Sequence, residues 1–177
     1  QWSNHIEAAD GTVRHQEYLH GDASDPREPF ARTLLDSLGG QGSICVYTSY
    51  EQNILTALAD ALPHMREALL ALLPRLWDLH AVVKAHYYHP GFGGSYSIKS
   101  VLPALIPALA YDDLEIQGGT RASLQYARMV FGGAEPAARD AAHDTRRPRE
   151  AVGAALPHGR NDVPQHPRLP VRRVVLR

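Results

Sequence analysis

Cysteine, net charge and long apolar runs are all scarce in this chain of 177 residues. The single cysteine, Cys45, excludes a disulfide scaffold within the chain, and its apolar neighbours indicate a small buried side chain. A formal net charge of −1 argues against a protein that coats a polyanion, but it allows an enzyme that meets phosphate through a few local groups or a metal. No run is apolar enough to span a membrane, and no charged start precedes an apolar signal core. We therefore expect a soluble, cytoplasmic protein.

What the chain does contain is enough apolar material for one folded domain. Hydrophobic residues make up 44% of the sequence, which suits a globular protein with a core of its own. The chain begins Gln1-Trp2-Ser3 without an initiator methionine, so we expect a fragment or a processed piece of a longer protein.

Turn signals and apolar periodicity predict alternating strands and helices through about residue 132. Asp10-Gly11 is a tight-turn signal that predicts a β-hairpin within the first twenty residues. The further elements expected are a helix over 26–38, a buried strand over 44–47, helices over 50–62 and 63–73, a short strand at 76–79 that leads into a helix, and helices after 98 and after 119. This order predicts a mixed α/β domain in which helices cover a sheet of limited size.

Composition changes from about Ala134 onward. The last 44 residues hold nine arginines, six prolines and no lysine, without apolar periodicity. A disordered basic tail would explain this composition, and so would a shift of reading frame in a GC-rich gene. We therefore divide the chain into a domain at 1–132 and an Arg/Pro-rich tail at 133–177.

Two carboxylates stand just beyond predicted strands. Glu51 follows the apolar strand by four residues, in the first turn of the next helix, and Asp78 stands at the junction between the short strand at 76–79 and its helix. The carboxyl edge of an α/β sheet is a common place for a binding site. A carboxylate in a first turn also stabilises the helix dipole or caps its end, and spacing alone favours this helix-cap interpretation for both residues.

The glycine-rich and aromatic segment 86–97 is the second candidate for function. Lys99 follows it in the first turn of a predicted helix, a suitable position for meeting phosphate, although Ile98 stands where a P-loop needs glycine. His80, His86 and His89 suggest zinc only weakly, because no further ligands stand at a recognisable spacing. The aromatic side chains could stack on unpaired bases, and packing of the loop onto the domain is the simpler interpretation. These side chains are Tyr87, Tyr88, Phe92 and Tyr96.

Several segments together resemble one bacterial family. They are Gln-Trp-Ser at 1–3, Val-Tyr-Thr-Ser-Tyr-Glu at 46–51, Trp-Asp-Leu at 77–79, Gly-Ser-Tyr-Ser-Ile-Lys at 94–99 and Tyr-Asp-Asp-Leu-Glu-Ile-Gln-Gly-Gly at 111–119. Over about residues 1–132 the chain resembles the domain of unknown function 2779, which is similar to DnaQ-like 3′ to 5′ exonucleases. The resemblance implies a ribonuclease H-like α/β fold, a mixed sheet flanked by helices and incomplete at the N-terminus.

The same resemblance implies a phosphodiester-cleaving site with two Mg²⁺ or Mn²⁺ ions that acts on single-stranded DNA or RNA. Glu51 matches a metal-associated acid, and Thr48 stands where asparagine is usual. Asp78 matches a supporting acid of the catalytic site, and Lys99, Tyr96 and Tyr47 are the expected substrate-binding residues. The opening Asp-x-Glu would lie upstream of Gln1 and a late aspartate should follow Val130, so we expect this chain alone to be inactive.

The missing late acid also favours the frame-shift interpretation of the tail. A non-catalytic module that uses the same fold to bind nucleic acid or protein is the alternative. It would bind without metal, and Glu51 and Asp78 would serve as helix caps.

Overall fold

The computed structural model describes residues 1–8, 10–107, 119–132 and 171–176. The chain divides into two units, which we describe separately. The first unit comprises Gln1–His20, Asp25–Tyr88 and Gly159–Arg177, and the second comprises Gly21–Ser24 and His89–His158.

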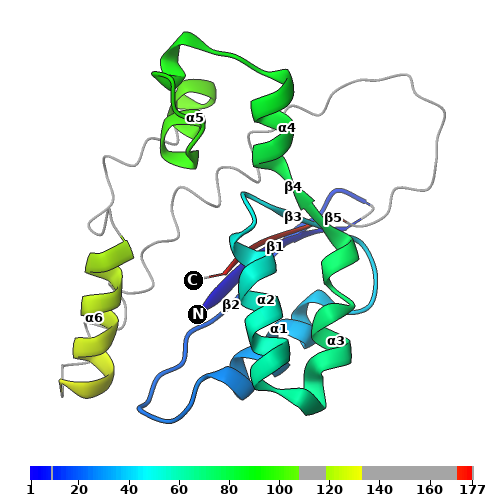
Figure 1. The fold of residues 1–177 in the computed structure, drawn as a ribbon, viewed down its shortest axis with the longest axis vertical. Helices are drawn as coiled ribbons and strands as arrows, with labels where there is room; N and C mark the ends of the chain where they lie inside the picture. Colours follow the sequence, from blue (N-terminus) through cyan, green and yellow to red (C-terminus); the bar gives the residue numbers. More distant parts are fainter. Residues whose placement is uncertain (9, 108–118, 133–170, 177) are drawn as a thin grey trace. The chain divides into compact units, whose positions relative to one another are not determined.

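A five-stranded mixed sheet organises the first unit, with strand order β2-β1-β5-β3-β4 (Figure 1). Its strands are β1 (Trp2–Glu7), β2 (Val13–Tyr18), β3 (Ser43–Val46), β4 (Leu76–Asp78) and β5 (Val171–Leu176). β1 is antiparallel to both β2 and β5, whereas β3 is parallel to both β5 and β4. The strand that comes last in the chain therefore lies in the middle of the sheet.

The hairpin of β1 and β2 forms where the Asp-Gly signal predicted it. The Asp10 carboxylate accepts hydrogen bonds from both the backbone N–H and the hydroxyl of Thr12. Gly11 has φ of 85°, in the left-handed region that glycine adopts without steric cost. The turn thus sets the register in which Trp2 lies opposite Tyr18.

Helical segments connect and cover these strands. They are α1 (Arg27–Leu38), α2 (Tyr50–Ala61), α3 (Arg66–Leu70) and α4 (Leu79–His86), with single 3₁₀ turns at Pro63–Met65 and Leu73–Arg75. The Asp25 carboxylate accepts the Arg27 N–H at the start of α1, and Pro26 takes the N-cap position one residue before the helix. α1 ends at Gly39, whose φ is 50°.

One apolar core joins the helices to the sheet. Leu34 and Leu38 of α1, Ile44 of β3 and Leu55 of α2 are all at most 2% exposed. Burial of each such side chain stabilises the fold by about 1.5–3 kcal/mol. The other buried members of this cluster are Trp2, Phe30, Ala31, Val46, Leu58, Ala59, Leu62, Leu69 and Leu72.

Polar groups also connect α1 to the hairpin. The Asn4 side-chain amide, fully buried on β1, donates to the Ser37 hydroxyl at 2.6 Å, and Ser37 in turn donates to Gln16 on β2 at 2.6 Å. The Trp2 indole N–H donates to the Thr33 hydroxyl. These bonds fix α1 on the face of β1 that carries Trp2 and Asn4.

In the part of the second unit that the structure describes, residues 89–97 of the glycine-rich segment are followed by helices α5 and α6. A 3₁₀ turn at Pro90–Phe92 precedes α5 (Ile98–Leu105), which contains Pro103, and α6 spans Gly119–Phe131. Phe92 is buried, and its ring contacts those of His89 and Tyr96 at centroid distances of 5.7 and 5.6 Å. These ring contacts lie within the segment itself, so packing of the loop onto the domain stays a prediction.

The mixed α/β class predicted from the sequence is confirmed. Two details differ from the predictions. Cys45 is half-buried, so β3 is not covered completely on both faces. Residues 171–176 lie within the predicted Arg/Pro-rich tail at 133–177 and form β5, where no strand was predicted. The remainder of that tail and residues 108–118 lie outside the described part of the chain.

Candidate functional site at the carboxyl ends of β3 and β4

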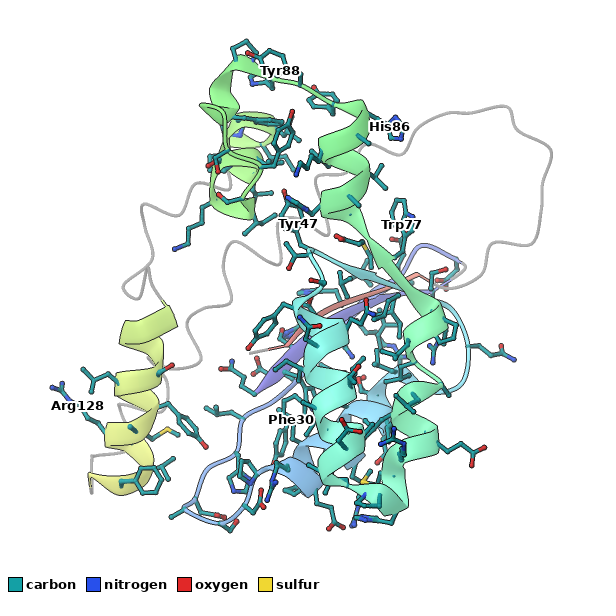
Figure 2. The ribbon with its side chains drawn as sticks, viewed as in Figure 1. Phe30, Tyr47, Trp77, His86, Tyr88 and Arg128 are labelled. Carbon is teal, nitrogen blue, oxygen red and sulfur yellow. The ribbon has the colours of Figure 1, made fainter. Side chains whose placement is uncertain are left out.

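The parallel strands β3 and β4 end side by side, because Val46 is paired with Asp78. Each strand turns directly into a helix, β3 into α2 and β4 into α4. Figure 2 shows Tyr47 just beyond β3 and Trp77 on β4 at this edge of the sheet. Asp78 is the last residue of β4, and Glu51 lies in the first turn of the helix that follows β3.

Asp78 holds both strand-to-helix junctions with one oxygen atom. Its Oδ1 accepts the backbone N–H of His80 at 2.9 Å, which caps α4, and the backbone N–H of Thr48 at 2.9 Å. The first bond is the N-cap predicted for this residue. The second bond was not predicted, and it ties the end of β4 to the loop between β3 and α2.

Thr48 has an unusual backbone conformation at this junction. Its φ is 82°, and among the described residues it is the one non-glycine position with positive φ. A β-branched residue in this region is strained, and observed strain of this kind is concentrated at functional sites.

Glu51 lies in the first turn of α2 and is 5% exposed. Burial of a carboxylate is costly without polar partners, so a surface helix rarely places one there. The Ser49 side chain makes no capping hydrogen bond, whereas the Thr48 hydroxyl accepts the Tyr50 N–H at a long 3.4 Å. Glu51 is thus built into the junction and is not a solvated acid of the helix surface.

Tyr47 packs against the first turn of α4. Its ring meets the His80 imidazole edge-on, with centroids 5.4 Å apart and planes at 70°. Both residues are half-buried. This contact fixes the aromatic ring beside Asp78 at the same edge of the sheet.

Arg75 connects the segments that lead into the amino ends of β3 and β4. Its guanidinium donates to four backbone carbonyls at 2.5 to 3.1 Å, those of Leu38, Gly39, Gln41 and Gly42. These carbonyls belong to the end of α1 and the loop that enters β3, and Arg75 itself precedes β4. Sequence reasoning missed this residue, because backbone carbonyl acceptors leave no pattern in the side chains.

The described residues do not make up a metal centre. They contain no group of three or more His, Cys, Asp or Glu side chains that could hold an ion. A two-metal site needs several carboxylates that converge from different strands, and here Asp78 Oδ1 already accepts two backbone N–H groups. Glu51 and Asp78 alone therefore do not fit the expected pair of metal ions. His80, His86 and His89 likewise join no such group within the described ranges.

Three of the predicted site residues lie at this edge. Tyr47, Glu51 and Asp78 belong to the first unit and surround the β3–α2 and β4–α4 junctions. Tyr96 and Lys99 belong to the second unit, which is described by itself. Tyr96 packs on Phe92 there, and Lys99 lies in the first turn of α5.

Comparison with known families places this edge in context. The family described as domain of unknown function (DUF2779) matches residues 1–97, more than half of the chain. The chain belongs to this family. The DUF2779 match includes Tyr47, Glu51, Asp78 and Tyr96, and it ends two residues before Lys99. No curated protein and no solved structure matches the chain.

Within the described residues, no helix of this DUF2779 chain is long and apolar enough to cross a bilayer.

Proposed function

We propose that this chain is part of a ribonuclease H-like nuclease domain, whose intact parent hydrolyses phosphodiester bonds of single-stranded DNA or RNA from the 3′ end. The observation that carries the proposal is the junction of β3 and β4, where a buried acid, a capping acid and a strained residue meet. They are Glu51, Asp78 and Thr48. Strain and a buried carboxylate at a carboxyl sheet edge are features of a binding or catalytic site, beyond what a plain helix cap needs.

The sheet supports the further proposal that this chain alone is inactive. A strand that preceded β1 in an antiparallel hairpin would lie beside β1, on the side away from β2. In a DnaQ-like domain, the opening strand with Asp-x-Glu would occupy this position in the sheet. β5 lies there instead, and its sequence Val-Arg-Arg-Val-Val-Leu brings no carboxylate. A central strand without acids is consistent with a site that lacks most of its ligands.

In the proposed parent, Mg²⁺ or Mn²⁺ would supply the charge that activates water and stabilises the leaving oxygen. Glu51 would be one of several acids around the ions, and Asp78 would position Thr48 beside them. Tyr47, Tyr96 and Lys99 would contact the nucleic acid, the tyrosines by stacking on bases and the lysine by pairing with phosphate.

A second candidate, a binding module without metal, rests on the hydrogen bonds of Asp78. Both known bonds of its carboxylate are to backbone N–H groups, as in a structural cap. Aromatic residues are also available on the surface of the first unit, since Tyr50, Trp77, Tyr87 and Tyr88 are 47–76% exposed. Base stacking on such rings contributes about 1–3 kcal/mol per base and needs no metal.

The two proposals differ in their response to metal and to loss of Glu51. We would incubate the intact parent with 3′-labelled single-stranded DNA and RNA in the presence of Mg²⁺, Mn²⁺ or EDTA, and compare Glu51→Gln with Glu67→Gln. Glu67 is an exposed acid on α3 and provides the matched control. Metal-dependent cleavage that only Glu51→Gln abolishes supports the nuclease.

Binding that persists in EDTA, falls with Lys99→Ala or Tyr96→Ala and tolerates Glu51→Gln supports the module. Equal cleavage by the Glu51→Gln variant would refute the role assigned to Glu51.

A further inference from the structure

We propose that α4 and the residues at its two ends form a path for single-stranded nucleic acid, in which Trp77 and Tyr88 stack on bases and Lys84 contacts phosphate. This α4 path rests on the proposed function and deepens it, because it places the bound strand on the first unit. Tyr96 and Lys99, the substrate-binding residues of the second unit, take no part in it.

The exposed aromatic side chains of the first unit gather around the carboxyl ends of β3 and β4. Trp77 on β4 is 52% exposed, and Tyr88, two residues after α4, is 76% exposed. Figure 2 shows Trp77 near the start of α4 and Tyr88 beyond its end. Tyr50 and Tyr87 are the other exposed aromatic residues in the described part of this unit, and Tyr50 begins α2 at the same edge. Such rings can stack on unpaired bases of any sequence.

The charge on α4 is complementary to phosphate. Residues 79–88 contain no Asp or Glu, and Lys84 lies exposed in the last turn of α4. The ion pairs found among the described residues do not include Lys84. By contrast, each arginine of α1 and α3 is paired with a carboxylate, in Arg27–Asp25, Arg32–Glu28 and Arg66–Asp60. α4 therefore offers a cation that no described carboxylate neutralises.

Aromatic rings at both ends of a helix, with a cation between them, match the chemistry of an unpaired strand. A single strand offers bases and phosphates together, whereas a duplex hides the faces of its bases in the stack. α4 has eight residues and is about 12 Å long, a length that a few nucleotides cover at about 3.4 Å or more each. Asp78 caps α4 and also binds the Thr48 N–H, so a strand along α4 reaches the candidate site.

Binding measured without metal tests the α4 path apart from cleavage. The full chain is titrated in EDTA into a fluorescein-labelled single strand of about 16 nucleotides, and anisotropy is followed. We expect Trp77→Ala and Tyr88→Ala each to weaken binding by about 5- to 150-fold, the range that stacking on one ring supplies. Lys84→Gln should reduce the slope of log affinity against log salt by about 0.7.

Two matched controls remove similar groups elsewhere. Phe131→Ala removes an exposed ring of α6, and Arg32→Gln removes a cation of α1 that is already paired. Both variants should bind as the unaltered chain does.

Tryptophan emission reports on the stacking itself. The chain has two tryptophans, and Trp2 is buried, so a change of emission on binding comes from Trp77. We expect the single strand to quench this emission, and an abasic strand of the same length to quench it little because it carries phosphates without bases. Trp77→Phe should remove the quenching and retain most of the affinity, since its ring still stacks.

Unaltered affinity in Trp77→Ala and Tyr88→Ala chains with native circular dichroism would overturn the α4 path, even if the intact parent cleaves nucleic acid. Absence of binding by the chain would overturn it as well. So would Trp77 emission that acrylamide does not quench in the free chain, because another protein surface then covers this side chain. Loss of cleavage by the parent, with binding along α4 retained, would count against the nuclease alone.

Discussion

Asp78→Ala and Asp78→Asn separate the structural role of this carboxylate from a chemical one. The alanine variant removes the acceptor for the backbone N–H groups of His80 and Thr48. Loss of an N-cap costs about 1 kcal/mol, and a hydrogen bond to a charged acceptor contributes about 1.5–3 kcal/mol. Because Asp78 is half-buried and water can reach the freed groups, we take the lower part of the combined range. We expect Asp78→Ala to lower the free energy of unfolding by about 2–3 kcal/mol.

The asparagine variant keeps an oxygen where Oδ1 accepts both N–H groups and loses only the negative charge. We expect it to cost less than about 1 kcal/mol. Urea unfolding of the full chain, followed by circular dichroism, measures the difference. With a slope of about 2 kcal/mol per molar, the midpoint should fall by about 1–1.5 M for alanine and by less than about 0.5 M for asparagine.

Equal midpoints for the two variants would refute the double-acceptor role of Asp78. If asparagine preserves the fold, the same variant in the intact parent reports directly on chemistry. Loss of cleavage with normal stability would then assign a function to the carboxylate charge, and unchanged cleavage would make Asp78 a cap alone.

Three further predictions concern other residues that shape the unit. Arg75→Ala should lower the free energy of unfolding by about 2–4 kcal/mol, because two of the four hydrogen bonds from Arg75 to backbone carbonyls are partly buried. In the same urea assay, Arg75→Lys should recover less than half of this loss. Thr48→Gly should raise the unfolding midpoint by the equivalent of up to about 1 kcal/mol because it relieves the positive φ, whereas Thr48→Val should lower it; a lower midpoint for glycine than for valine would contradict the strain. Hydrogen bonds from the side chain and the backbone of Arg27 lower the pKa of Asp25 to about 2, so its stabilising effect is present above about pH 4 and is lost as the pH falls toward 2; Asp25→Asn should flatten this part of an acid-unfolding curve, and an unchanged curve would contradict the assignment.

Features set by local chemistry could be predicted from the sequence. The Asp10-Gly11 turn places two strands in register, and a carboxylate at the end of a short strand caps the next helix, as Asp78 does. Helical periodicity located α1 and α2, because their apolar stripes need only 3.6-residue spacing. In each case the residues that decide the structure lie within a few positions of one another.

Features set by distant partners could not be predicted in the same way. The four bonds of Arg75 depend on where the chain brings carbonyl groups from the end of α1. The bond from Thr48 to Asp78 connects residues thirty positions apart, and the strained φ follows from that tertiary context. Glu51 was located correctly in a first turn, but its burial depends on the packing of α2 at the sheet edge.

β5 is the largest such case, and it bears directly on the candidate site. The six residues of β5 include adjacent arginines and show no regular alternation, so their sequence does not predict a central strand. Their place in the sheet follows from their pairing with β1 and β3. β5 runs parallel to β3 and β4, so its carboxyl end faces the edge where Asp78 and Thr48 meet. A strand with acidic residues at the position of β5 would add carboxylates to that edge, whereas β5 adds none. The identity of the central strand therefore decides how many carboxylates stand at this edge, which is the point on which the proposed nuclease and the proposed binding module differ.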